Sequence, residues 1–271
     1  MDIYIPALAS HIPIVRANIL KLKTFCPKSP ITIVTPDVCD YQREIGCLFD
    51  DVGIKNDLMY LPIAKEKIAM CLPGHLRYKS SWYYQQFLKY DIILKSQSPV
   101  CLIVDADTIL LSSPEQYANI NLYSSEYNKS YFHLFEFAMR CSAPLPRSSI
   151  VNFMIFNKHV LSGMISHVET IHSISFFDFI MSALAQSADY EFSEYEMYAN
   201  WYALTIGFQD CKKLRLFRRA DLLTSPNRID SILPILMAKN YEAVACERNH
   251  ARSFHKFLLA KFILLLGIDY W

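Results

Sequence analysis

Apolar and polar positions follow one another along this chain in a way that predicts a repeating order of strands and helices. Short apolar runs at residues 3–6, 31–34 and 58–61 have the length of strands. Between the first two, residues 10–25 place apolar side chains at helical spacing, with Ser10 as the expected helix cap. This strand–helix–strand opening is typical of a nucleotide-binding half built on a parallel sheet.

The strongest pattern is the unbroken apolar run at residues 100–104, which leads directly into Asp105, Ala106 and Asp107. Such a run predicts a strand covered on both faces, and its carboxyl end is where open α/β sheets bind ligands. Mn²⁺ and Mg²⁺ prefer oxygen ligands, and Mg²⁺ combines one or two protein carboxylates with substrate phosphates. The pattern favours a metal at Asp105 and Asp107 and a phosphate-bearing substrate, with a nucleotide-sugar as the leading candidate. A plain turn or helix cap is the alternative for so short a motif.

The rest of the chain is expected to be mainly helical, with a few further strands. Helices are expected at residues 64–71, 81–95, 158–171, 175–187, 194–206 and 229–239. Strands are expected at residues 151–157, 214–218 and 241–245. Residues 121–149 are rich in Tyr, Ser and Pro and are expected to form an irregular region beside an acceptor.

These elements predict an α/β fold with a mostly parallel central sheet flanked by helices. No internal repeat or linker interrupts the pattern, so we expect a single domain over residues 1–271. Within it, residues 1–110 would bind a nucleotide-sugar and residues 111–250 would face the acceptor. Residues 251–271 are expected to form an apolar helical tail.

Composition narrows the function. With 52% hydrophobic and 14% aromatic residues, the chain can bury a sizeable core. Its 6 glycines form no GxGxxG motif and no lysine-containing phosphate loop, which argues against Rossmann dehydrogenases and P-loop kinases. The net charge of +1 gives no indication of nucleic-acid binding.

Cysteine spacing and the N-terminus favour a cytoplasmic location. The 8 cysteines are scattered and none forms a CxxC pair, which fits reduced thiols better than a disulfide framework. The first ten residues lack the basic and apolar regions of a signal peptide, so none is expected. No run reaches the ~20 apolar residues that a membrane-spanning helix needs.

The C-terminal part is basic and ends in an apolar tail. Residues 212–261 contain 11 Lys and Arg against 4 Asp and Glu, which fits either a solvated face or contact with an anionic surface. The apolar run at residues 257–266 is too short to span a bilayer. Lys256, Lys261 and Trp271 suit a peripheral contact of residues 253–271 with the inner face of the membrane. A final helix packed on the core is the equal alternative.

Several polar residues are candidates for binding the substrate. Gln85, Gln86 and Lys89 share one face of the helix at 81–95, where the lysine could neutralise a phosphate and the glutamines could bond a base or ribose. An ordinary polar helix face explains them as well. Asp37, after the second strand, could accept a hydrogen bond from uracil or a similar base, or could be a turn residue.

Glu194 is the candidate general base. Ser193 and Glu196 have the spacing of a capping box, which gives Glu196 a structural role and leaves Glu194 free to point outward. Glu194 could then take the proton from an acceptor hydroxyl; the helix end lowers its pKa, and desolvation in a dry site would offset that. A histidine near the end of the chain could be a third metal ligand or bond the diphosphate, and His255 is favoured over His250. Most histidines in proteins do neither, which is the alternative.

Four blocks together resemble a known family. They are Ser-Trp-Tyr-Tyr-Gln-Gln-Phe-Leu-Lys at 81–89, Asp-Ala-Asp-Thr-Ile-Leu-Leu at 105–111, Val-Asn-Phe-Met-Ile-Phe-Asn at 151–157 and Phe-Ser-Glu-Tyr-Glu-Met-Tyr at 192–198. Their order is similar to that in GT-A-type glycosyltransferases, and more narrowly to a poorly characterised bacterial group found in surface-polysaccharide gene clusters. The chain departs from the pattern at Tyr84, where a basic residue is more usual, and at residues 7–11, which lack glycine.

The resemblance implies a GT-A-like fold and a nucleotide-sugar donor, with a UDP-sugar as the leading candidate. It places the donor at Pro6, Ala7 and Ala106, the Mn²⁺ or Mg²⁺ at Asp105 and Asp107, and the base of an inverting reaction at Glu194.

The expected function is therefore metal-dependent transfer of a sugar to a hydroxyl of a glycan or lipid-linked glycan, in bacterial surface-polysaccharide synthesis. The alternatives are a nucleotidyltransferase or phosphotransferase, which also uses acid-bound metal, and a non-catalytic membrane-peripheral binding protein.

Overall fold

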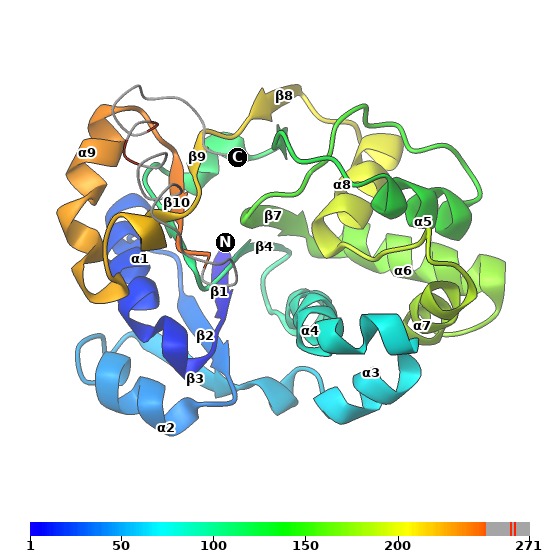
Figure 1. Ribbon diagram of the computed structural model, residues 1–271, viewed down its shortest axis with the longest axis horizontal. Helices are drawn as coiled ribbons and strands as arrows, with labels where there is room; N and C mark the ends of the chain where they lie inside the picture. Colours follow the sequence, from blue (N-terminus) through cyan, green and yellow to red (C-terminus); the bar gives the residue numbers. More distant parts are fainter. Residues whose placement is uncertain (248–260, 262, 264–271) are drawn as a thin grey trace.

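A five-stranded sheet lies at the centre of the chain, of which the computed structural model describes residues 1–247, 261 and 263 (Figure 1). Its strands are ordered β3-β2-β1-β4-β7. Their bounds are β1 Asp2–Pro6, β2 Ile31–Thr35, β3 Val52–Asn56, β4 Val100–Val104 and β7 Phe153–Asn157. β1 to β4 are parallel and β7 runs antiparallel to β4, so the predicted α/β fold with a mostly parallel sheet is confirmed.

The strand order places a ligand-binding crevice between β1 and β4. From β1 the chain builds outward to β2 and β3, and then returns to place β4 on the other side of β1. At such a reversal the loops after the two central strands diverge and leave a crevice at their carboxyl ends. The loops after Pro6 and after Val104 therefore form its walls.

Two small sheets and nine α-helices complete the described part of the chain. The strands are β5 Thr108–Leu110, β9 Leu216–Phe217 and β10 Ala243–Ala245 in one sheet, and β6 Ile120–Tyr123 and β8 Asp210–Lys213 in the other. The helices are α1 Ile12–Phe25, α2 Val38–Tyr41, α3 Lys65–Cys71, α4 Ser80–Lys95, α5 Lys129–Met139, α6 Lys158–His172, α7 Phe176–Gln186, α8 Glu194–Thr205 and α9 Leu233–Ala238. α1, α2 and α9 lie on one side of the sheet, and α4, α6 and α7 on the other (Figure 1).

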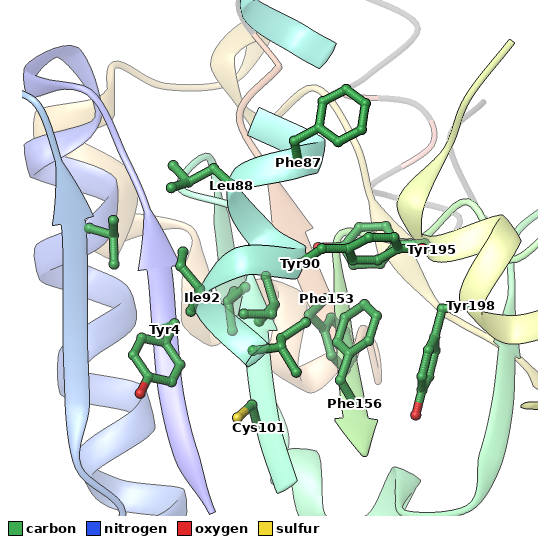
Figure 2. Close-up of a cluster of buried hydrophobic side chains, with 14 of the residues drawn as sticks. Tyr4, Phe87, Leu88, Tyr90, Ile92, Cys101, Phe153, Phe156, Tyr195 and Tyr198 are labelled. Atoms are coloured by element: carbon green, nitrogen blue, oxygen red, sulfur yellow. The ribbon is translucent and has the colours of Figure 1, made fainter. Parts of the chain in front are cut away.

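The main core lies where α4 and α8 meet β4 and β7. The four residues 101–104 of β4 are fully buried, as the apolar run predicts for a central parallel strand. Phe156 of β7 packs against Tyr90 of α4 and against Tyr195 and Tyr198 of α8, at ring-centroid distances of 6.3, 6.0 and 4.4 Å (Figure 2). These aromatic contacts fix α8 relative to the strand that ends in the Asp pair.

The third strand lies earlier than the sequence pattern suggests. Residues 58–61 form no strand; β3 occupies Val52–Asn56, and a 3-10 turn follows at Asp57–Met59. The prediction was wrong because β3 is an edge strand with exposed Lys55, so its apolar run is short, whereas Leu58 and Met59 are apolar but exposed.

Two other expectations are corrected. Residues 121–149 are less irregular than expected, since they contain α5, capped by the side chain of Asn128 and buried through residues such as Phe132 and Phe135. Their helical spacing was masked by the Ser- and Pro-rich segments on either side. Ser10 does not cap α1. A 3-10 turn at Ala9–His11 precedes the helix, so His11 occupies the N-cap position.

The C-terminal strands and helix are shorter than expected. The strand expected at 214–218 is reduced to β9, and the helix expected at 229–239 is divided into a 3-10 segment at Pro226–Ser231 and α9, which has Pro234 in its first turn. Most of the expected tail at 251–271 lies outside the described residues.

No single helix of the described residues is long and apolar enough to cross a membrane. The pair α6 and α7 meets that test only when both are counted together, and the two are bent by 63°.

Candidate active site

The loop that carries Asp105 and Asp107 is fixed by backbone hydrogen bonds on both sides. The N–H of Asp105 donates to the carbonyl of Asn152 at 2.9 Å, and the N–H of Cys246 donates to the carbonyl of Asp107 at 2.8 Å. Ala106 is buried between the two acids, whose side chains are partly exposed. Both carboxylates therefore lie at the crevice predicted by the strand order.

A cleft with two chambers occupies this crevice. One chamber, of about 880 Å³, contains the Asp pair. The other, of about 460 Å³, lies at the ends of β1 and β2. The two chambers share the lining residues His11, Tyr78, Trp82 and Gln85, so they adjoin. Chambers of this size hold small-molecule ligands, and two adjoining ones suit an elongated ligand.

Most of the residues expected to bind donor or metal line this two-chambered cleft. They are Pro6, Ala7, Gln85, Gln86, Lys89, Asp105, Ala106 and Asp107, and the expected base Glu194 lines the cleft as well.

Asp37 is not among the lining residues. Its Oδ2 accepts a hydrogen bond from the N–H of Ala9 at 2.7 Å, which ties the loop after β2 to the loop after β1. This contact supports the turn alternative for Asp37. His255 lies outside the described residues.

The centre of the large chamber is a lysine held between two acids. Lys89 Nζ lies 2.5 Å from Asp105 Oδ1 and 2.5 Å from Glu194 Oε1. Lys89 is 4% exposed and Glu194 is 3% exposed, so the pair is shielded from water. The ammonium also lies 4.2 Å from the centroid of the Tyr195 ring, which adds a cation–π contact.

Neighbouring polar groups hold this ion cluster in place. The Tyr195 hydroxyl donates to Asp105 Oδ1 at 2.9 Å, and the N–H of Glu194 donates to Gln86 Oε1 at 2.9 Å. The Tyr90 hydroxyl donates to the carbonyl of Glu194 at 2.7 Å, and Figure 2 shows the side chains of Tyr90 and Tyr195 between α4 and α8. The start of α8 is thus bound to α4 by side-chain hydrogen bonds as well as by charge.

The electrostatics of the cluster differ from residue to residue. Burial alone would lower the pKa of Lys89, but the carboxylates of Asp105 and Glu194 raise it well above its usual value. Burial raises the pKa of Glu194, and Lys89 offsets part of that effect. Burial, with repulsion from Asp105 and Glu247, raises the pKa of Asp107 to about 7. Asp107 therefore holds its proton more readily than an ordinary carboxyl, and Lys89 offsets only part of the effect.

The Asp pair fits a divalent cation. Asp105 uses Oδ1 to bind Lys89 and Tyr195, and Asp107 uses Oδ1 to accept from Thr108, so neither Oδ2 has a hydrogen-bond partner in the described part of the chain. Two carboxylates suffice for Mg²⁺ or Mn²⁺ when phosphates and water complete the shell. Among the described residues no group of three or more His, Cys, Asp or Glu could hold a metal. A bound cation would also offset the burial and the repulsion from Asp105 and Glu247 that raise the pKa of Asp107.

Two expectations about the start of α8 are corrected. Glu194 does not point outward, because Lys89 draws its carboxylate into the protein. Ser193 caps the helix as expected, with Oγ accepting from the N–H of Glu196. The Glu196 carboxylate does not complete the capping box; it accepts from the Ser148 hydroxyl and the Ser149 N–H at 2.5 and 2.7 Å instead. These groups and the Asn200 amide satisfy the oxygens of a carboxylate that is fully buried.

Several residues of the site were not predicted from the sequence. Asp57, buried at the end of β3, accepts from the Tyr84 hydroxyl at 2.9 Å, which gives a structural reason for tyrosine at that position. At the mouth of the large chamber, Arg218 pairs with Glu126 and, at 3.6 Å, with Glu247. The only available signal was the basic segment around Arg218, because these partners are far apart in sequence.

Comparisons with known proteins give similarity at the level of three-dimensional structure. No known family profile matches the chain, and no curated protein matches its sequence. The galactosyltransferase LgtC, solved with donor and acceptor sugar analogs, is 10% identical, with a TM-score of 0.48, over 98% of this chain and 95% of that one. Mouse xyloside xylosyltransferase 1 is 11% identical, with a TM-score of 0.45, over 93% and 100%. The bifunctional glycosyltransferase WbbM is 9% identical, with a TM-score of 0.45, over 99% and 51%. Similarities this distant do not assign their activities to this chain.

The buried ion cluster predicts a strong effect of removing its cation. Lys89→Met leaves Asp105 and Glu194 without their partner in a shielded position, and we expect the free energy of unfolding to fall by about 3–5 kcal/mol. Urea denaturation measures this change. Lys23→Met, which breaks the exposed pair with Asp51, is the control and should cost about 1 kcal/mol or less. Equal losses in the two variants would contradict the role given to Lys89.

The raised pKa of Asp107 predicts a dependence of stability on pH. Since its pKa is raised to about 7 in the folded state, the folded protein holds a proton that the unfolded chain releases near pH 4, and stability should fall as the pH rises between these values. Thermal midpoints at pH 5 and pH 8 in EDTA should show the fall for the wild type and a smaller one for Asp107→Asn. Exposed Asp50 gives the control Asp50→Asn, which should behave as the wild type. An unchanged slope in Asp107→Asn would refute the assignment.

Proposed function

We propose that this chain is a glycosyltransferase that moves a sugar from a nucleotide-sugar donor to a hydroxyl of a glycan or lipid-linked glycan. The observation that carries the proposal is the pair Asp105 and Asp107 at the strand-order reversal, in a cleft whose second chamber adjoins it. A nucleoside would occupy the small chamber beside Pro6 and Ala7. The diphosphate and sugar would then extend into the large chamber, towards the Asp pair.

The residues of the large chamber suit departure of a nucleoside diphosphate. Asp105 and Asp107 would hold Mn²⁺ or Mg²⁺, which when bound supplies positive charge to the leaving diphosphate. Lys89 is fixed beside Asp105 and is already paired with two acids, so its first effect is to orient the Asp105 carboxylate. Gln86 lines the same chamber with a buried Nε2 that lacks a partner in the described residues, and this amide could donate to a donor oxygen.

Glu194 is proposed as the base of an inverting reaction. Its Oε1 binds Lys89, whereas its Oε2 has no hydrogen-bond partner in the described part of the chain. In the proposed step the acceptor oxygen bonds to the anomeric carbon, its proton passes to Glu194, and the bond from that carbon to the diphosphate breaks. Burial, which raises the pKa of Glu194, favours proton uptake.

The wider setting is part of the same proposal. We propose a UDP-sugar as donor, an acceptor in bacterial surface-polysaccharide synthesis, and action in the cytoplasm at the inner face of the membrane. The basic excess of residues 212–261 supports contact with an anionic surface or a phosphorylated lipid carrier.

A ligand panel tests the function directly. We expect one nucleotide-sugar to raise the thermal midpoint only with Mn²⁺, since a ligand at a hundredfold excess over its dissociation constant stabilises by ~2.7 kcal/mol. Asp105→Asn and Asp107→Asn should lose the Mn²⁺-dependent shift, and Asp50→Asn should keep it. With acceptor present, sugar transfer releases nucleoside diphosphate. Release of pyrophosphate would instead identify a nucleotidyltransferase, and full function in the two Asp variants would indicate a binding protein.

The role of Glu194 has its own test. Glu194→Gln keeps the shape and the hydrogen-bonding oxygen that faces Lys89, but cannot take a proton, so we expect kcat to fall about 10²–10⁴-fold with little change in KM for the donor. Glu191→Gln is the matched control, because Glu191 also pairs with a lysine but does not line the cleft. Unchanged kcat, or a product of retained anomeric configuration, would exclude the base role.

A further inference from the structure

A separate cavity of about 240 Å³ lies at the other end of strands β4 and β7, away from Asp105 and Asp107. It is bounded by Val100 at the start of β4 and by Asn157 at the end of β7, which pair in the sheet register. Asp105 lies five residues further along the chain, about 17 Å away at the rise of a strand. The two sets of lining residues do not overlap, so this cavity, which we call the rear cavity, is distinct from the two-chambered cleft.

Aromatic rings form much of the wall of the rear cavity. Tyr202 and Phe208 stack with ring centroids 4.6 Å apart, and Tyr198 lies 5.9 Å from Tyr202. Tyr117 and Phe153 contribute further rings, 5.6 Å apart. Flat, weakly polar faces of this kind bind the C–H faces of ring-shaped ligands.

Three asparagines supply the polar part of the wall, and all three share one property. The side-chain oxygen of each is already used within the protein: Asn119 Oδ1 accepts from the Tyr202 hydroxyl, and Asn121 Oδ1 accepts from the Ser149 hydroxyl. Asn157 Oδ1 caps α6 by accepting from two backbone N–H groups, which fixes the orientation of its amide. None of the three Nδ2 groups has a hydrogen-bond partner in the described part of the chain.

These unused donors determine what can fill the rear cavity. Asn121 is 3% exposed, so a ligand in the cavity would cover its amide, and covering an amide without offering it an acceptor costs free energy. A hydrocarbon ligand would impose that cost, because it offers no oxygen to the three amides. A ligand with several hydroxyl oxygens would remove it and could still lay an apolar ring face on the tyrosines.

The size of the cavity limits the ligand to one ring. A cavity of about 150 Å³ holds benzene, and drug-sized ligands need about 300 Å³ or more. The rear cavity, at about 240 Å³, lies between these values. A single substituted six-membered ring fits that interval.

We propose that the rear cavity binds one pyranose ring, with its C–H face against Tyr202 and Phe208 and its hydroxyl oxygens accepting from the amides of Asn119, Asn121 and Asn157. The ring would belong to a free monosaccharide or to one residue of a longer glycan. This site does not depend on the proposed transfer reaction, because none of its residues lines the two-chambered cleft.

Saturation-transfer NMR on the full chain tests the proposal without any turnover. The probes are methyl α-D-glucopyranoside, methyl β-D-galactopyranoside and hexan-1-ol, with lactose to test whether a ring within a chain can enter. We expect at least one methyl glycoside to bind with millimolar affinity and hexan-1-ol not to bind. Lactose binding would identify a glycan residue as the ligand, and binding of the methyl glycosides alone would identify a monosaccharide.

Asn119→Asp is the decisive variant. It replaces the amide nitrogen by an oxygen, keeps the acceptor for Tyr202, and suits the positive φ of 61° at this exposed position. We expect glycoside affinity to fall about tenfold. Asn240→Asp is the matched control, since Asn240 is also exposed with a φ of 59°, and it should bind as the wild type. Phe208→Ala, which removes a stacked ring, should weaken binding about threefold to tenfold.

Three results would overturn the proposal. The first is the absence of binding by either methyl glycoside and lactose. The second is wild-type affinity in Asn119→Asp and Phe208→Ala, which would place the sugar elsewhere. The third is binding of hexan-1-ol in place of the glycosides, which would make the rear cavity a hydrocarbon site.

Discussion

The arrangement of the cleft depends on one buried ammonium group shared by two carboxylates. Lys89 comes from α4, Asp105 from the end of β4 and Glu194 from the start of α8, so the cluster joins three segments that are far apart in sequence. A buried charge is costly unless it is paired. If one of these segments were misplaced, a charge in the cluster would be left buried without its partner. The ion cluster therefore acts as a condition on folding as well as a feature of the site.

The same cluster makes the two acids of the Asp pair unequal. Asp105 is paired with Lys89 and accepts from Tyr195, whereas Asp107 has neither contact. Burial, with repulsion from Asp105 and Glu247, raises the pKa of Asp107. A cation bound between the two carboxylates of the Asp pair would reduce the repulsion between them. Phosphate groups of a ligand could then complete the coordination of that cation. The proposed metal would therefore offset the repulsion of Asp107 by Asp105 and Glu247.

Sequence patterns predicted those parts of the molecule that depend on local periodicity. The apolar run of β4 and the strong helical spacing of α4 required only neighbours in sequence, and the position of Asp105 and Asp107 at a strand end followed from them. The pairing of Lys89 with Glu194 could not be predicted, because it depends on how α8 packs on α4 through aromatic side chains. Expecting Glu194 to face outward treated its helix as an isolated surface helix. Edge strand β3 was misplaced for a similar reason, since its pairing with β2 decides its position.

The antiparallel pairing of β4 with β7 sets the geometry at both ends of these two strands. Val104 pairs with Phe153 beside the carbonyl of Asn152 that holds Asp105, and Val100 pairs with Asn157 at the rear cavity. A loop insertion at one end of these strands would alter either the two-chambered cleft or the rear cavity, and would leave the other unchanged. Losing or gaining a single residue within β7 would shift the whole ladder and turn its side chains to the opposite faces. Evolution can therefore vary the two openings separately only through their loops, and the length of β7 between them is not free to change.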